Sequence, residues 1–104
     1  MIRAGLEMAG YSVLEAANLD EATHRLEEQT VDAVLTALDL QPNGRSPLLA
    51  VLQGRSEWSE IPAVALVDPE ELVRASAARA AGFQDCQSKF DRVLVLASVA
   101  RIVS

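Results

Sequence analysis

The stretch IPAVALVDPEE (residues 61–71) decides the fold, because a strand ends within it where a helix begins. Its apolar first half predicts a β-strand, with Pro62 near the beginning, where a missing backbone N–H is tolerated. Asp68 then suits the N-cap of a helix, Pro69 suits the first helical position, and Glu71 three residues later completes a capping box. The stretch therefore predicts a strand followed directly by a helix.

Strand-like and helix-like segments alternate on both sides of this stretch. Apolar runs predict strands at 11–17, 31–37 and 61–67, and a short fourth strand is expected at 83–88. Capping residues and helical periodicity predict helices at 1–9, 18–28, 46–53, 68–81 and 92–104. Such alternation is typical of a three-layer α/β fold, a parallel sheet with helices on both faces. In sheets of this kind ligands bind at the carboxyl ends of the strands.

Composition favours one globular domain spanning 1–104. Half of the 104 residues are apolar and 23% are charged, which is the balance of a folded chain. No apolar run is long enough for a membrane span, and one cysteine with one histidine can form neither a disulfide nor a zinc site. The net charge of −6 argues against nucleic acid as a partner. We expect a cytoplasmic protein.

The string AAGFQDCQSKFDR (80–92), preceded by IPAVALV and by DAVLTALDLQPNG, resembles the response-regulator receiver domain of two-component signalling. The resemblance covers the chain from Ile2 to Val103 and implies a CheY-like, flavodoxin-like fold. Its last part is similar to the receiver at the C-terminus of CheA-type chemotaxis histidine kinases, which are bacterial. In this family an aspartate accepts a phosphoryl group, while Mg²⁺, a hydroxyl side chain and a lysine stabilise the transferring group.

The resemblance can be carried over one position at a time. Lys89, the only lysine of the chain, matches the lysine that binds phosphoryl oxygens. The hydroxyl switch position falls on Val67 and the aromatic switch position on Cys86. The acceptor position falls on Ala37, which has no carboxylate. The acceptor carboxylate and the hydroxyl of the phosphorylation chemistry therefore have no matching side chain at these positions.

The family's acidic pair, which binds Mg²⁺, belongs to a first strand that would precede Met1. We therefore expect the first strand and the metal ligands to be absent, about four strands and five helices to remain, and no cofactor to be bound. We also expect the sequence to be a segment of a longer signalling protein. Without the first strand, the strands 11–17 and 31–37 are left with unpaired edges, which favours a homodimer or direct pairing of the two.

Two functions of different classes follow. The first is a non-enzymatic pseudo-receiver that acts through protein contact. The second is an active receiver that accepts a phosphoryl group on Asp39, two residues beyond Ala37, and only this alternative requires Mg²⁺. A third option, an unrelated small-ligand binder, would need a glycine-rich phosphate loop that the sequence lacks. The first function is the one we predict.

The partner surface is predicted from the last helix. The segment RVLVLASVARIVS (92–104) carries apolar residues on more than one face, whereas a surface helix normally has a single apolar stripe. The resemblance places a protein-contact face there, with Lys89, Arg92 and Arg101 near it. A histidine kinase or a chemotaxis coupling protein is the expected partner, with neither nucleic acid nor membrane involved. Lys89 could otherwise point into solvent or pair with Asp39 or Asp68.

Overall fold

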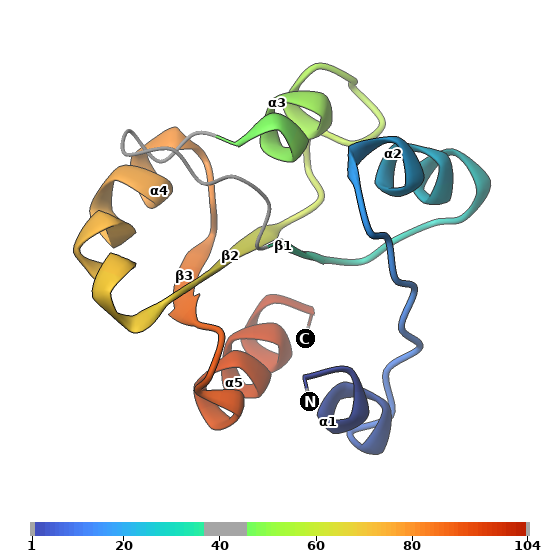
Figure 1. Ribbon diagram of the computed structural model, residues 1–104. Coiled ribbons are helices and arrows are strands. Elements are labelled where there is room, and N and C mark those ends of the chain that lie inside the picture. Colours follow the sequence, from blue (N-terminus) through green and yellow to red (C-terminus); the bar gives the residue numbers. More distant parts are fainter. Residues whose placement is uncertain (1, 37–45, 104) are drawn as a thin grey trace.

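The computed structural model describes residues 2–36 and 46–103 and shows a small parallel sheet between two layers of helices (Figure 1). The strands are β1 (Val34–Thr36), β2 (Ala63–Val67) and β3 (Asp85–Ser88). The helices are α1 (Ile2–Met8), α2 (Leu19–Glu28), α3 (Pro47–Gln53), the 3₁₀-helix η1 (Pro69–Arg74), α4 (Ala75–Ala81) and α5 (Arg92–Val103). The strands pair in the order β1-β2-β3, all parallel.

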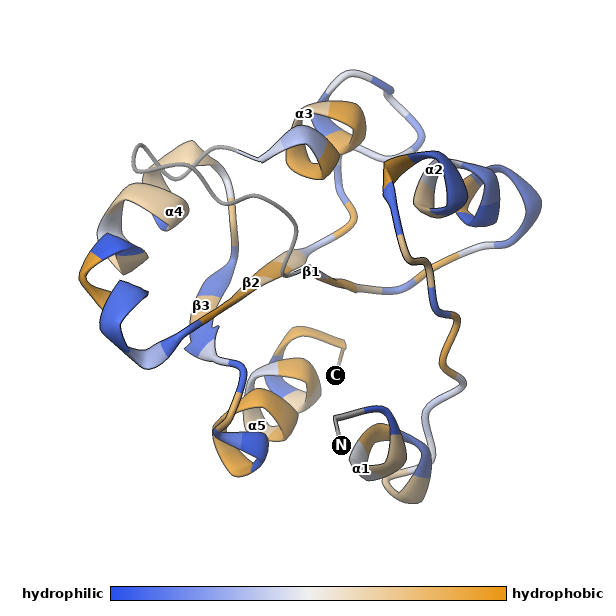
Figure 2. Cartoon of the chain, in the orientation of Figure 1, coloured by the Kyte–Doolittle hydropathy of each residue, from blue (hydrophilic) through white to orange (hydrophobic). Residues whose placement is uncertain are grey.

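Alternating side chains of β2 build the two halves of the core. Ala63, Ala65 and Val67 belong to the apolar cluster formed with α2, α3 and α4 on one side of the sheet. Val64 is fully buried. Because side chains alternate along a strand, it belongs to the opposite face, the face that α1 and α5 cover (Figure 1). Figure 2 shows β2 as hydrophobic throughout. A strand buried on both faces is what the unbroken apolar run of 61–67 favours.

Local capping chemistry sets the helix boundaries as predicted. The Asn18 side chain accepts a hydrogen bond from the backbone N–H of Glu21 (2.9 Å), which starts α2. Ser46 does the same for Leu49 (3.1 Å) at the start of α3. Gly82 ends α4 with a φ of 126°, and an added Cβ there would collide with the side-chain amide of Gln53.

The prediction of a strand at 11–17 is wrong. Residues 11–16 have no regular structure and enter no ladder, so the described residues form three strands rather than four. Leu14 remains 39% exposed. Strand propensity is expressed only when a neighbouring strand supplies hydrogen bonds and packing, and the described residues provide none on that edge of β1. The expected direct pairing of 11–17 with 31–37 is therefore also wrong.

Two further boundaries differ from prediction. The single helix expected over 68–81 is divided into the 3₁₀-helix η1 and the α-helix α4. Short 3₁₀ turns often precede α-helices, and η1, with 6 residues, is longer than most of them. The strand expected over 31–37 is limited to β1 among the described residues. Within the described ranges, no helix is long and apolar enough to cross a membrane.

Candidate functional site

The carboxyl ends of the neighbouring strands β2 and β3 lie side by side. Val67 is paired in register with Ser88, the last residue of β3. The backbone N–H of Lys89 donates to the carbonyl oxygen of Val67 (2.9 Å), so the pairing continues one residue beyond β3. This hydrogen bond brings Lys89 beside Asp68, the residue that precedes η1.

Lys89 and Asp68 form an ion pair at these strand ends. The Lys89 Nζ lies 2.8 Å from the Asp68 Oδ1, and both side chains are 39% exposed. The hydrogen bond to Asp68 and its negative charge raise the pKa of Lys89 above its ordinary value, with smaller contributions from Glu71 and Glu70. Of the arrangements expected for Lys89, the structure places it against Asp68.

The two positions that the sequence resemblance assigns to switch residues hold buried side chains. Val67 and Cys86 are each 3% exposed and pack in the core cluster beneath α3 and α4. Burial raises the pKa of the Cys86 thiol, so it stays protonated at neutral pH. Val67 carries no hydroxyl, and Cys86 offers a small apolar group where the resemblance implies an aromatic ring.

Ala37 and the rival acceptor Asp39 lie outside the described residues. Their contribution rests on sequence alone, which places a methyl group at the acceptor position. Within residues 2–36 and 46–103, no three His, Cys, Asp or Glu side chains are grouped so that they could hold a metal ion. The described residues therefore do not form the carboxylate site that Mg²⁺ requires.

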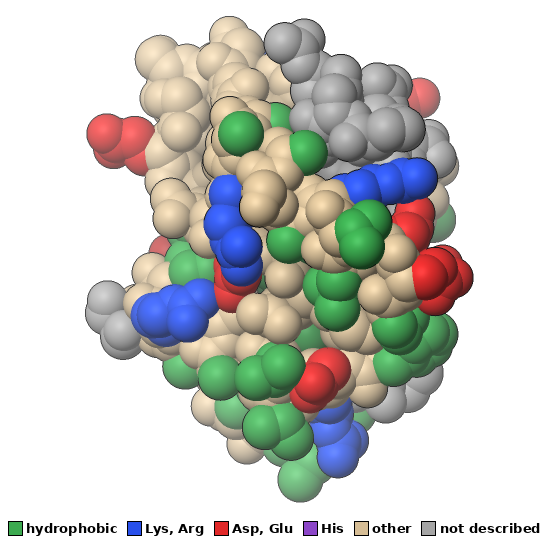
Figure 3. All heavy atoms as spheres, turned by 90° about the vertical axis from the view of Figure 1, so that its left-hand side faces the viewer, with side chains coloured by type: hydrophobic (Ala, Val, Ile, Leu, Met, Phe, Trp, Pro, Cys, Tyr) green, Lys and Arg blue, Asp and Glu red, His purple; other side chains and the backbone are tan. Residues whose placement is uncertain are grey.

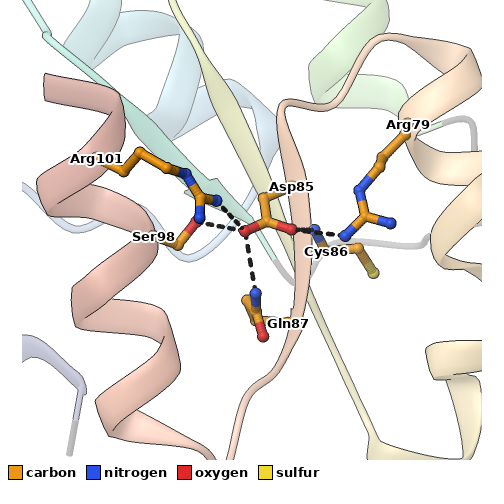
Figure 4. A network of polar contacts seen from close by, with 6 residues as sticks. All are labelled: Arg79, Asp85, Cys86, Gln87, Ser98 and Arg101. Atoms are coloured by element: carbon orange, nitrogen blue, oxygen red, sulfur yellow. Dashed lines mark hydrogen bonds and ion pairs between the residues drawn. The ribbon is translucent and has the colours of Figure 1, made fainter.

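A second polar cluster lies at the opposite, amino end of β3, around the carboxylate of Asp85 (Figure 4). The Asp85 side chain is only 3% exposed. Five groups donate hydrogen bonds to it. They are the side chains of Arg79 (2.9 Å), Gln87 (3.0 Å), Ser98 (2.8 Å) and Arg101 (2.7 Å) and the backbone N–H of Cys86 (2.8 Å).

The surroundings of Asp85 favour its charged form. Burial by itself raises the pKa of this carboxyl, but the hydrogen bonds from Gln87, Arg79, Ser98 and the Cys86 N–H outweigh it and hold the pKa far below the ordinary value of 3.8. Because Arg79 lies on α4 and Ser98 on α5, the carboxylate connects both helices to β3. The cluster is a structural connection between three elements.

Sequence reasoning missed Asp85 as a key residue. Its donors are six residues before it on α4 and thirteen and sixteen residues after it on α5, and no local pattern relates such positions. The one available signal was an aspartate inside the predicted strand 83–88, because a charge there needs partners if the strand is buried.

The three predicted surface cations do not lie together. Lys89 follows the carboxyl end of β3, whereas Arg101 contacts Asp85 at its amino end. Arg92 packs its aliphatic stem against α1, because a Cβ added at Gly5 would lie 3.0 Å from the Arg92 Cδ. The predicted partner surface is therefore divided between the two ends of α5.

Exposed apolar side chains follow Lys89 directly. Phe90 is 73% exposed, Val93 75% and Leu94 49%, whereas Val95 and Val99 of the same helix are buried. This confirms the prediction that apolar residues of the last segment occupy more than one face. Figure 3, which views the side of η1, α4 and β3, shows apolar side chains gathered on the lower part of that face.

Comparison with known proteins identifies the fold. No protein-family model matches the chain, and no curated protein matches it in sequence. Among solved structures, the chain is similar to the signal receiver domain of a signal transduction histidine kinase from Syntrophus aciditrophicus. The match has a TM-score of 0.73 and 22% sequence identity, and it covers 98% of this chain and 78% of the other. The protein therefore has the CheY-like receiver fold that its sequence predicts.

Proposed function

We propose that this chain is a pseudo-receiver of two-component phosphorelay signalling, a non-enzymatic domain that acts by protein contact without accepting a phosphoryl group. The receiver fold supports the signalling role, since the similar solved domain is described as a signal receiver of a histidine kinase. The residues at the ends of the strands support the loss of phosphoryl transfer. Fold alone does not decide between these chemistries, because function depends on the site.

The observation that carries the proposal is the set of side chains at the carboxyl ends of the strands, where the resemblance places phosphorylation. Val67 ends β2 as a buried valine, which cannot hydrogen-bond a phosphoryl oxygen. Ala37 offers no carboxylate to accept the group. Lys89, the one matching cation, already has an anionic partner in Asp68 at 2.8 Å.

Contact with a protein partner is supported by the exposed apolar residues beside these strand ends. Phe90 and Val93 are each more than 70% exposed. Apolar side chains gather on the lower part of the face in Figure 3, and a contiguous exposed apolar patch favours association. We propose a histidine kinase or a chemotaxis coupling protein as the partner, in the cytoplasm, with the chain attached to a CheA-type kinase as its receiver. A homodimer is part of the proposal, and light scattering that gives a monomeric mass contradicts that part.

An active receiver is the second candidate, favoured by one feature of the sequence. Asp39 stands two residues after Ala37, so its side chain would share the side of the acceptor position if the chain stayed extended. In this case Lys89 would meet a phosphoryl group formed on Asp39, and Mg²⁺ would be required.

Incubation with acetyl phosphate and Mg²⁺, followed by the mass of the intact protein, separates the two functions. We expect no added phosphoryl group on the natural sequence or on the Asp39→Asn variant. A phosphoryl adduct that forms on the natural sequence and disappears in Asp39→Asn overturns the proposal. The Asp32→Asn variant removes an exposed carboxylate elsewhere and is the matched control.

A further inference from the structure

The loop between β2 and η1 is organised around Asp68. Its backbone N–H donates to the Glu71 Oε1 (3.2 Å), and its carbonyl oxygen accepts from the backbone N–H of Glu71 (2.8 Å). Glu71 in turn binds Arg74 (3.3 Å). These contacts, made by backbone atoms of Asp68, hold the first turn of η1, so the residue whose carboxylate meets Lys89 is fixed to the start of η1.

The loop between β3 and α5 is organised around Ser88 and Asp91. The backbone N–H of Asp91 donates to the carbonyl oxygen of Ser88 (3.0 Å), and that of Phe90 donates to the Ser88 hydroxyl (3.3 Å). The Asp91 carboxylate accepts from the N–H of Leu94 (3.1 Å) and caps α5. Lys89 therefore stands immediately before the turn that starts α5.

Exposed apolar side chains are attached to both loops. Val73 of η1 is 88% exposed, and Phe90 and Val93 flank the start of α5. The Lys89 Nζ lies 5.6 Å from the centre of the Phe90 ring, within the range of a cation–π contact. The ion pair thus lies between two elements, η1 and α5, that carry exposed apolar side chains near the pair.

We propose that the Asp68–Lys89 ion pair is a latch that joins the two loops and holds these exposed apolar side chains in one arrangement without any covalent modification. The inference rests on the proposed function, since it identifies what takes the anionic role beside Lys89. The chain supplies this anion itself, in every copy. The contact surface is then set by the fold rather than by a phosphorylation event.

Nearby acidic residues do not replace Asp68 in this role. Glu71 is engaged by Arg74 and by the Asp68 N–H, and the Asp91 carboxylate caps α5. Glu70 acts on Lys89 only through its charge. Asp68 is thus the carboxylate in direct contact, and Glu70 is a natural control.

The test compares Asp68→Asn with Glu70→Gln, which change the net charge equally. Asparagine keeps the N-cap preference of aspartate, so η1 can still begin at the same residue. In Asp68→Asn we expect the pKa of Lys89, followed by NMR of its side chain, to fall toward the ordinary value. We also expect hydrogen exchange of the Lys89 and Leu94 amides to speed up by roughly two- to fivefold, the range that an exposed pair supplies. Glu70→Gln should change neither by a comparable amount.

A double-mutant cycle with Lys89→Met keeps the test decisive. If the latch is real, either single variant speeds the exchange and the double variant adds no further increase. Equal effects of Asp68→Asn and Glu70→Gln, or simple additivity in the cycle, overturn the latch. The phosphoryl adduct experiment is independent of this result, so failure of the latch and failure of the proposed function are distinguishable.

Discussion

The two ends of β3 carry the same kind of interaction in opposite environments. At the amino end, the Asp85 carboxylate is 3% exposed and receives five hydrogen bonds from three elements. At the carboxyl end, Lys89 meets one carboxylate, and both side chains are 39% exposed. Both ends thus carry an ion pair that involves an aspartate. The pair at the amino end is buried on its carboxylate side, whereas the pair at the carboxyl end is partly exposed to solvent on both sides.

The difference shows which end maintains the fold and which can change. A buried charge stays favourable only while its partners remain, so losing one of them is strongly destabilising. An exposed ion pair contributes little to unfolding free energy and is screened by salt. The amino end of β3 is thus suited to hold α4 and α5 in place, whereas the ion pair at the carboxyl end contributes little to the stability of the fold.

Asp85→Ala is expected to give the largest effect. The variant leaves the buried Ser98 hydroxyl and the Cys86 N–H without an acceptor, whereas the partly exposed arginines can return to water. We expect a loss of about 2–4 kcal/mol in unfolding free energy, measured by urea denaturation. Asp32→Ala, on an exposed residue, is the control, and an equal loss there would contradict the assignment.

Ser98→Ala sharpens the comparison by removing one donor. The Ser98 side chain is buried, and its hydroxyl donates to the Asp85 Oδ2 at 2.8 Å. We expect a loss of about 1–2 kcal/mol, less than for Asp85→Ala because four donors remain. The exposed Ser76→Ala in α4 should be close to neutral. A Ser98→Ala variant as stable as Ser76→Ala would show that the hydroxyl contributes nothing.

Acidification tests the charge of Asp85 directly. Its folded-state pKa lies below 3.8, so the stability that it contributes is fully present above its unfolded value and is lost as the pH falls from there through the folded value. The stability difference between the natural sequence and Asp85→Asn should therefore be constant near neutral pH and shrink progressively below about pH 4. Urea midpoints at a series of pH values measure it. A difference that persists unchanged to low pH contradicts the charged network.

Lys89→Met is expected to give the smallest effect on stability. Methionine keeps much of the aliphatic stem and removes a charge that is mostly in contact with solvent and Asp68. We expect no shift of the urea midpoint beyond experimental error, at low or high salt. A loss approaching that of Asp85→Ala would break the comparison, since both ends of β3 would then maintain the fold.

Much of the fold could be predicted from short patterns. The caps at Asn18 and Ser46 and the left-handed glycine at 82 were recognised because capping depends on residues within three or four positions of one another. The parallel arrangement followed from the order of the segments. The absence of a strand at 11–16 could not be predicted in the same way, because a strand requires a partner from elsewhere in the chain.

The candidate site could likewise be predicted only in part. The side chains at the strand ends, Val67 and Lys89, were located correctly because each strand ends where a helix signal begins. The surface expected around Lys89, Arg92 and Arg101 was not one surface, because residues nine apart on a helix are separated by roughly 13 Å along its axis. Sequence reasoning treated them as neighbours, whereas β3 and α5 place them at opposite ends.

By itself the sequence determined the identity of the chemical groups and the local beginning and end of the helices, since both depend on near neighbours. It determined that one lysine and no acceptor carboxylate stand at the receiver-like positions 89 and 37. Only the tertiary structure decided that Asp68 neutralises Lys89 and that Asp85 is buried among donors from α4 and α5. Charge pairing and burial depend on distances across the sheet, and those distances exist only once the chain has folded.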